Sequence, residues 1–275
     1  MFDLGLLGAG NMAEAIARAA IARGVLRADR ITASDPSPAR RELFAAMGVH
    51  AVHDNASVIA SSSQLLLAVK PQTLAQVAAD LAKHARPEQV IVSILAGVGA
   101  RRLGDAINAA LGQAGRPAQR WRIVRVMPNT PMLVGEGMAG VAIGPDAHES
   151  DADLALSLFR AGGKAVVVDE RHIDAITAVS GSGPAYLFYL AEAMQQAARA
   201  LGLEEHAQTL VNQTLLGAAR LLAESPDGAA ELRRKVTSPG GTTEAAIRHL
   251  EDQSVRGAFI DAVRAARDRS VELGR

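Results

Sequence analysis

The sequence predicts an α/β fold in which a doubly wound, mostly parallel sheet is followed by an all-helical C-terminal domain. Three observations lead to this prediction: short apolar runs alternate with helical segments up to residue 168, no convincing strand follows Asp169, and a glycine-rich turn joins the first strand to the first helix. Strands that alternate with helical segments of about 10–15 residues are typical of βαβ units and a parallel sheet. We therefore expect one domain at 1–168 and a second at 169–275.

The strands of the first domain are expected to be short and buried on both faces, because they are apolar runs rather than alternating ones. We place them at 2–7, 30–34, 49–52, 64–69, 90–95, 122–127, 138–143 and 165–168. The helices between them are expected at 11–23, 38–47, 56–60, 71–84 and 100–111.

In the second domain, apolar residues recur at spacings of three and four, which predicts helices. A long helix is expected after Pro184, with Leu187, Leu190 and Met194 on one face. Further helices are expected at 206–223, 228–235, 243–250 and 255–273.

Composition excludes several kinds of chemistry. The chain has 275 residues, no cysteine, and 29 basic and 29 acidic side chains. Disulfides, thiolate nucleophiles and cysteine-bound metals are therefore absent, and zero net charge gives no reason to expect nucleic acid or an anionic membrane as partner. No H-E-x-x-H pattern, secretory signal or membrane-length apolar run is visible. We expect a cytoplasmic protein without a metal.

The turn after the first strand fits the dinucleotide-binding pattern G-x-G-x-x-A through Gly8, Gly10 and Ala13. The first glycine permits the tight turn, the second lets the backbone approach a pyrophosphate, and the alanine allows close packing of helix on strand. The helix N-terminus offers free N–H groups to the anion. At the first βα turn of an alternating domain, this pattern predicts a Rossmann-like site for NAD(H) or NADP(H).

Asp35, at the end of the second strand, leaves the nucleotide preference open. A carboxylate there can accept a hydrogen bond from the ribose 2′-hydroxyl of NAD(H). However, Ser34, Arg40 and Arg41 are close enough in sequence to surround the 2′-phosphate of NADP(H). Alternatively, Asp35 or Ser37 caps the following helix.

Two further loops of small residues are candidates for substrate binding. One is 128–131, after a strand, and the other is 238–243, before a helix. The second presents N–H groups and hydroxyls at a helix N-terminus, which suits a carboxylate, although an ordinary capped helix start explains it equally well. The run at 180–183 lacks the first glycine of G-x-S-x-G, so it does not predict a nucleophilic serine.

Six motifs in order resemble the pyrroline-5-carboxylate reductase family along essentially the whole chain. They are 8–12 (GAGNM), 68–71 (AVKP), 93–98 (SILAGV), 125–131 (RVMPNTP), 179–186 (VSGSGPAY) and 238–243 (SPGGTT). The resemblance implies NAD(P)H-dependent reduction of L-1-pyrroline-5-carboxylate to L-proline, the last step of proline biosynthesis. It also implies that the helical domain forms a homodimer, which in this family can assemble further.

The resemblance assigns residues to both ligands. Cofactor contacts are expected from Leu7, Gly8, Gly10, Asn11, Met12, Asp35, Asn55, Ala68, Val69, Lys70, Pro71, Ala96 and Gly97, with the nicotinamide against 68–71 and 96–97. Substrate contacts are expected from Ser238, Gly240, Gly241, Thr242 and Thr243. Backbone N–H groups of this loop would hold the carboxylate, and the Thr243 hydroxyl, as the catalytic group, would hydrogen-bond the ring nitrogen.

The sequence departs from the family in two places. Arg233 and Arg234, followed by Lys235, stand where a Lys-Asp pair is usual, and this positive charge could attract an anionic substrate. Asp35 replaces a neutral residue typical of members that prefer NADPH, so we expect appreciable use of NADH.

Alternative activities are reduction of another cyclic imine and, less favoured, the reaction of a β-hydroxyacid dehydrogenase. The latter enzymes use a lysine on the long helix of the second domain as general acid. No lysine lies between Lys164 and Lys235, so that mechanism has no proton donor here. A redox sensor that binds NAD(H) would need a partner-binding module, and none is evident.

Overall fold

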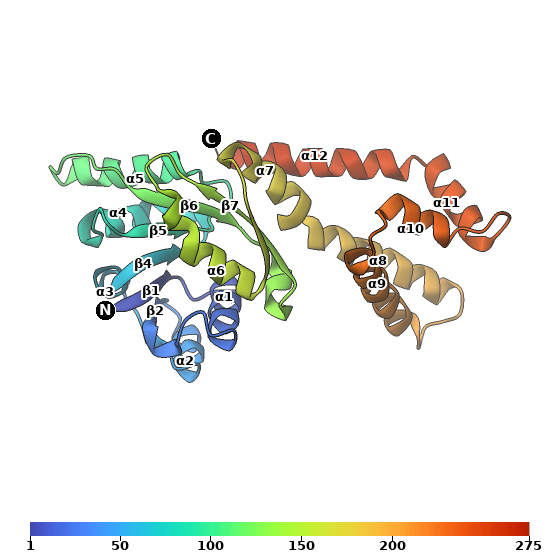
Figure 1. Cartoon of the computed structure of the whole chain (residues 1–275), viewed down its shortest axis with the longest axis horizontal. Helices are drawn as coiled ribbons and strands as arrows, with labels where there is room; N and C mark the ends of the chain where they lie inside the picture. Colours follow the sequence, from blue (N-terminus) through green and yellow to red (C-terminus); the bar gives the residue numbers. More distant parts are fainter. Residues whose placement is uncertain (275) are drawn as a thin grey trace. The chain divides into compact units, whose positions relative to one another are not determined.

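The computed structural model describes residues 1–274, which form two compact units. The first unit contains 1–182 together with the C-terminal segment from Ala266, and the second contains Gly183–Ala265 (Figure 1). The predicted change from α/β to all-α structure near residue 169 is seen in the order of elements. The compact units nevertheless divide about a dozen residues later, because the short helical turns that follow the last strand pack against the sheet.

One sheet carries all the described strands, in the spatial order β3-β2-β1-β4-β5-β6-β7-β8. Their bounds are β1 Phe2–Leu7, β2 Ile31–Ser34, β3 His50–Val52, β4 Ser62–Leu67, β5 Val90–Ser93, β6 Arg122–Met127, β7 Gly137–Ile143 and β8 Gly163–Val167. Every pair is parallel except β6 with β7, so the prediction of a mostly parallel sheet is confirmed. The chain order reverses between β1 and β4, and ligands of such sheets bind at this switch point.

Helices cover both faces of the sheet (Figure 1). One face packs on α1 (Asn11–Ala22), α2 (Pro38–Ala46) and α6 (Asp153–Ala161). The other packs on α3 (Asn55–Ser61), α4 (Leu74–His84) and α5 (Ala100–Gln113). Successive strand residues alternate between the two cores: Leu66 belongs to the first, and Leu65 and Leu67 to the second. This confirms the doubly wound fold.

Several details of the predicted elements are wrong. The fifth strand ends at Ser93 rather than at residue 95, and the eighth spans Gly163–Val167 rather than 165–168. The fourth strand is two residues earlier than expected, because Ala68 and Val69 leave the sheet and line a cavity at its edge. Helix α6 was not expected, although Leu154, Leu158 and their neighbours carry a helical spacing that buries Leu158 in the core.

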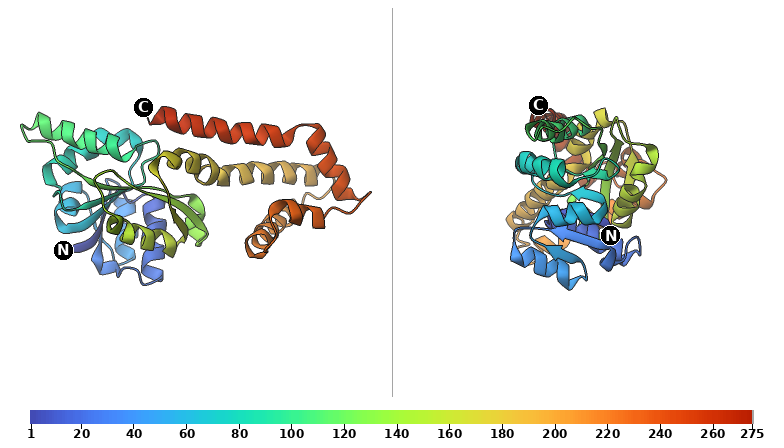
Figure 2. Two further views of the ribbon diagram at one scale, coloured as in Figure 1. Left: turned by 45° about the horizontal axis from the view of Figure 1, so that its top comes forward. Right: turned by 90° about the vertical axis from the view of Figure 1, so that its left-hand side faces the viewer.

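Between the sheet and the second unit, the chain forms α7 (Ile173–Ile176) and a π-helical turn at Thr177–Gly181. The second unit is helical, as predicted: α8 Gly183–Ala200, α9 Ala207–Glu224, α10 Ala229–Lys235, α11 Thr242–Asp252 and the first part of α12 Val255–Leu273. The end of α12 belongs to the first unit (Figures 1 and 2).

The helical unit has almost no core of its own. Across residues 183–265, only Ala207 and Val211 are buried. Large apolar side chains on α8, such as Phe188 at 64% exposure, remain uncovered. An isolated soluble unit rarely exposes so much apolar surface, so this unit requires a partner surface.

Candidate active site

A cavity of about 570 Å³ opens at the carboxyl ends of β1, β2 and β4, at the switch point of the sheet. Among the predicted cofactor residues, its lining includes Gly8, Gly10, Asp35, Asn55 and 68–70. The other predicted cofactor residues, Leu7, Asn11, Met12, Pro71, Ala96 and Gly97, do not line this cavity. The structure therefore brings the predicted pyrophosphate and ribose residues together, while the placement of the nicotinamide against 96–97 stays a prediction.

The glycine loop has the backbone geometry that its sequence predicts. Gly8 adopts a φ of +94°, and a Cβ there would lie 2.8 Å from the carbonyl oxygen of Ala68. Gly10 has an extended backbone, and a Cβ there would meet nothing within 4 Å. Ala13 is completely buried against the sheet. Gly8 is thus required by the fold, whereas Gly10 keeps open space at the N-terminus of α1, as a bound pyrophosphate needs.

Asp35 connects the glycine loop to the turn after β2. One carboxylate oxygen accepts from the N–H of Ala9 at 2.9 Å, and the other accepts from the N–H of Ser37 at 2.9 Å. Ser37 occupies the N-cap position of α2, but its side chain makes no capping bond. The expected capping of α2 is therefore made by neither side chain. The Asp35 carboxylate instead fixes the backbone at the rim of the cavity.

The two arginines after Asp35 are held by protein groups. Arg40 donates to the carbonyl of Ala9 and forms an ion pair with Glu14 at 2.9 Å. Arg41 donates to the carbonyls of Asp35 and Pro36, each at 2.8 Å. Burial acts to raise the pKa of the Glu14 carboxyl, but hydrogen bonds from Arg18 and Arg40 outweigh it and lower that pKa. Glu14 is therefore ionised at neutral pH and compensates the charge of Arg40.

A polar network forms another part of the cavity lining. The Ser34 hydroxyl donates to Asn55 Oδ1 at 2.6 Å, and the Asn55 amide donates to Asp80 at 2.8 Å. The lining also contains His53 and Gln76. Sequence reasoning missed Gln76 and Asp80 of α4, although these two residues are four positions apart and so share a helix face.

The predicted substrate loop forms the start of α11 in the helical unit. The Gly240 N–H donates to the Glu244 carboxylate at 2.7 Å, and the Gly241 N–H donates to the Ser238 carbonyl at 3.0 Å. These two amides are thus used within the turn. The first N–H groups of a helix have no partner inside it, and here these include the N–H groups of Thr242 and Thr243. Whether this loop holds the substrate stays a prediction.

The basic run before this loop makes local ion pairs. Arg233 lies 3.6 Å from Glu251, Arg234 lies 2.5 Å from Glu231, and Lys235 pairs with Asp227. Because each of these three cations has a nearby carboxylate, the basic run contributes little net positive electrostatic potential. This argues against the expectation that it attracts an anionic substrate.

The motif at 128–131 has a structural role in the first unit. Asn129 is buried, donates to the Ser180 carbonyl at 3.0 Å, and accepts from the N–H of Met138 at 2.8 Å. It thereby ties the sheet to the π-helical turn of the 179–186 motif. A Cβ at Gly181 would lie 2.7 Å from the terminal methyl group of Met127, so the π-helical turn packs closely on the end of β6.

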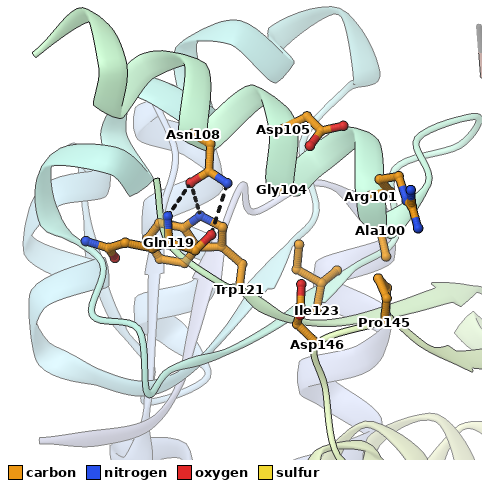
Figure 3. A pocket seen from close by; sticks show the side chains of 10 residues that line it. All are labelled: Ala100, Arg101, Gly104, Asp105, Asn108, Gln119, Trp121, Ile123, Pro145 and Asp146. Atoms are coloured by element: carbon orange, nitrogen blue, oxygen red, sulfur yellow. Dashed lines mark hydrogen bonds between the residues drawn. The ribbon is translucent and has the colours of Figure 1, made fainter. Parts of the chain in front are cut away.

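A second cavity of about 300 Å³ lies between α5, the start of β6 with the segment before it, and the turn after β7 (Figure 3). Its central polar side chain is Asn108, which accepts from the Gln119 N–H and from the Trp121 ring, and donates to the Gln119 carbonyl, each at 3.0 Å. Asp105 and Arg101 are exposed at its rim. Since the hydrogen bonds of Asn108 serve the fold, nothing converges on a ligand here.

Residues 1–274 contain no group of three or more His, Asp or Glu side chains placed to hold a metal ion. Within the same residues, no helix is both long and apolar enough to cross a membrane.

The sheet order, the switch-point cavity and the glycine loop define a class of protein: a dinucleotide-binding oxidoreductase with a helical second unit. Comparison with known proteins narrows this to one family. Residues 170–273 match the family described as pyrroline-5-carboxylate reductase dimerisation, and residues 3–97 match NADP oxidoreductase, coenzyme F420-dependent.

Full-length relatives carry the same name. The chain is 40% identical to the pyrroline-5-carboxylate reductase of Methanosarcina acetivorans over 99% of its own length and 98% of the relative's. It is 42% identical to that of Pseudomonas aeruginosa over 98% and 96%. The structure of the Coxiella burnetii enzyme superposes with a TM-score of 0.87 at 38% identity, covering 100% of this chain and 99% of that one. The chain belongs to the pyrroline-5-carboxylate reductase family, which confirms the resemblance.

Proposed function

We propose that this protein reduces L-1-pyrroline-5-carboxylate to L-proline with NAD(P)H, the last step of proline biosynthesis. The observation that carries the proposal is the full-length similarity to reductases of this name, from an archaeon to plants, at about 40% identity. The switch-point cavity supports it independently, because that cavity and its glycine loop fit a dinucleotide. A related reductase from Plasmodium falciparum, with a TM-score of 0.86, has NADP bound.

The chain's own residues hold and orient the reactants. The N-terminus of α1 and the space above Gly10 receive the pyrophosphate, and Ser34, Asp35 and Asn55 provide polar groups for the adenosine ribose. When bound, the reduced nicotinamide supplies a hydride. Residues 68–71 and 96–97 hold the ring at the carboxyl ends of β4 and β5, where they also exclude water.

The turn at 238–243 presents the imine. The N–H groups of Thr242 and Thr243 bind the carboxylate at the helix N-terminus, where the dipole favours negative charge. The Thr243 hydroxyl hydrogen-bonds the ring nitrogen, which must gain a proton as C5 receives the hydride. An ordinary threonine is not a strong acid, so it positions the nitrogen or relays a proton. Orientation in a water-excluded site supplies much of the rate.

The active form in this proposal is a homodimer. Its support is the helical unit, in which only Ala207 and Val211 are buried across residues 183–265, together with the match of 170–273 to a dimerisation family. Burial of the exposed apolar face of α8 against a second copy would supply the missing core.

The experiment that tests this function is spectrophotometric oxidation of NADPH by the purified protein with pyrroline-5-carboxylate. Cyclic imines without a carboxylate serve as comparison substrates. We expect turnover of pyrroline-5-carboxylate with a kcat/KM at least about a hundredfold higher than for the uncharged imines, because the carboxylate contacts are then lost. Equal or better turnover of an uncharged imine would identify a different imine reductase.

We also propose that NADH is used appreciably beside NADPH. The Asp35 carboxylate lines the cavity, where it would repel a 2′-phosphate and accept a hydrogen bond from a 2′-hydroxyl. Arg40 and Arg41, the cations available to bind that phosphate, are bonded to Glu14 and to backbone carbonyls. The ratio of kcat/KM for the two nucleotides, in wild type and Asp35→Ser, tests this. The variant should shift the ratio toward NADPH, and a wild-type ratio strongly favouring NADPH would contradict the proposal.

A further inference from the structure

Arg125 is a buried cation that is assigned neither to the cofactor nor to the substrate. It lies on β6, with a side chain only 8% exposed, at the start of the 125–131 motif. Its guanidinium faces two carboxylates, Glu170 and Asp174, each 3.5 Å away. A buried guanidinium is tolerated only where carboxylates and hydrogen bonds compensate for the lost water. This cluster is therefore an organised part of the fold. The further hydrogen bonds of its two carboxylates show which segments of the chain it connects.

Each of these carboxylates also accepts a hydrogen bond from another segment of the chain. Glu170 accepts from the N–H of Ala100 at 2.6 Å, and Ala100 is the first residue of α5, directly after the 95–99 loop. Asp174 accepts from the hydroxyl of Ser270 at 2.8 Å, and Ser270 is a buried residue in the last turns of α12. One cation thus links the start of α5 to the end of the chain, and the end of α12 lies beside α7 (Figures 1 and 2).

The end of α12 also contacts the 95–99 loop directly. Gly97 has a φ of +71°, and a Cβ there would lie 2.9 Å from the Cβ of Leu273. The guanidinium of Arg102, in the first turn of α5, donates to the Leu273 carbonyl at 2.9 Å. The loop that carries Ala96 and Gly97 therefore packs on the last helical turn of the same compact unit.

We propose that Arg125, Glu170, Asp174 and Ser270 are positioning residues, which fix the end of α12 as a support behind the 95–99 loop and so set the position of the nicotinamide ring. The proposal rests on the proposed function, in which 96–97 contact that ring. Ala96 and Gly97 have almost no side chain with which to anchor themselves, so the loop depends on what packs behind it. Hydride transfer is sensitive to displacements of about 1 Å, so a loosened support lowers the rate without removing any contact to the substrate.

The test uses the full-length protein and removes the two hydrogen bonds that hold α12, in the double variant Ser270→Ala/Arg102→Ala. The matched control is Arg269→Ala/Arg101→Ala, which changes exposed neighbours on the same two helices. Three quantities are measured: kcat with pyrroline-5-carboxylate, the Kd of NADPH, and the Kd of 2′-phospho-ADP-ribose, which lacks the nicotinamide. We expect kcat to fall about 10- to 100-fold and NADPH to bind more weakly, while the fragment's affinity stays within about twofold.

Amide hydrogen exchange of 95–103 in single Ser270→Ala provides a readout that needs no substrate. This segment should exchange faster than in the wild type, while β1 and β4 exchange as before. The proposal is overturned if exchange of 95–103 is unchanged, if kcat and NADPH affinity match the control, or if affinity for the fragment falls as much as affinity for NADPH. Failure of the wild type to reduce pyrroline-5-carboxylate would refute the proposed function alone, since the binding and exchange results judge the positioning cluster separately.

Discussion

Replacing Gly10 by alanine should separate cofactor binding from stability. The backbone at Gly10 has φ −70° and ψ −178°, which alanine adopts without strain, and the added Cβ would touch nothing within 4 Å. The free energy of unfolding should therefore stay the same or rise by up to about 1 kcal/mol, because alanine restricts the unfolded chain. The methyl group would instead occupy the space into which a pyrophosphate must come.

The expected loss of affinity can be estimated from one hydrogen bond. Holding the pyrophosphate away from the α1 N-terminus removes at least one N–H bond to a charged oxygen, which contributes about 1.5–3 kcal/mol. That corresponds to an increase in the Kd of NADPH of about 10- to 150-fold. The assays are fluorescence titration with NADPH and thermal unfolding of the apo protein.

Gly8→Ala is the matched control, since it places the same methyl group in a different environment. At φ +94° and 2.8 Å from the Ala68 carbonyl oxygen, the methyl group strains the backbone itself. This variant should lose about 1–3 kcal/mol of stability as well as affinity. If Gly10→Ala binds NADPH like the wild type, the pyrophosphate does not lie on this loop and the placement of the cofactor is refuted.

Three further predictions concern the substrate, the dimer and pH. Thr243→Ala should lower kcat/KM for pyrroline-5-carboxylate by about tenfold or more, the equivalent of one lost hydrogen bond, while the Kd of NADPH stays unchanged; a parallel loss of NADPH affinity would contradict the assigned role. Phe188→Asp should shift the protein from dimer to monomer in light scattering, because it places a charge on the exposed apolar face of α8, whereas Gln196→Asp, at an exposed polar position, should not. Asp151 is almost fully buried, which acts to raise its pKa, but hydrogen bonds from Arg122 and from the His148 N–H outweigh burial and lower the pKa below its usual 3.8. Its contribution to the free energy of unfolding is therefore complete above the pKa that Asp151 has in the unfolded chain. It is lost as the pH falls through the lower pKa that Asp151 has in the folded protein. Asp151→Asn should cost about 1–3 kcal/mol of stability at pH 7 and flatten the decline below pH 4 in urea unfolding; an unchanged acid limb would contradict this.

Much of the fold followed from local sequence patterns. The strands of the sheet, the long C-terminal helices and the change to all-α structure after the last strand are encoded by apolar spacing within each segment. The shifted β4 and the unexpected α6 depend on more than local spacing: the end of a strand depends on where its neighbours leave the sheet, and α6 is short and has few strong boundary signals.

The glycine loop shows what the sequence by itself determined. The conformational needs of Gly8, Gly10 and Ala13 are local, because they depend on the turn between one strand and one helix, so their pattern predicts the dinucleotide site directly. The motifs at 68–71 and 238–243 likewise indicated the family, because each is a short continuous run that can be recognised in the sequence alone.

Only the tertiary structure decided which distant residues share a site. Gln76 and Asp80 line the cavity because α4 packs beside the switch point. Asp35 accepts a hydrogen bond from the glycine loop. Arg125, through its two carboxylate partners, connects α5 to α12. These relations arise when the strands pair and the helices pack, which brings together residues 26 to 96 positions apart in the sequence. Spacing along a chain predicts contacts within one helix or turn, but it carries no information on which elements meet, and so the carboxylates around Arg125 could only be found in the folded protein.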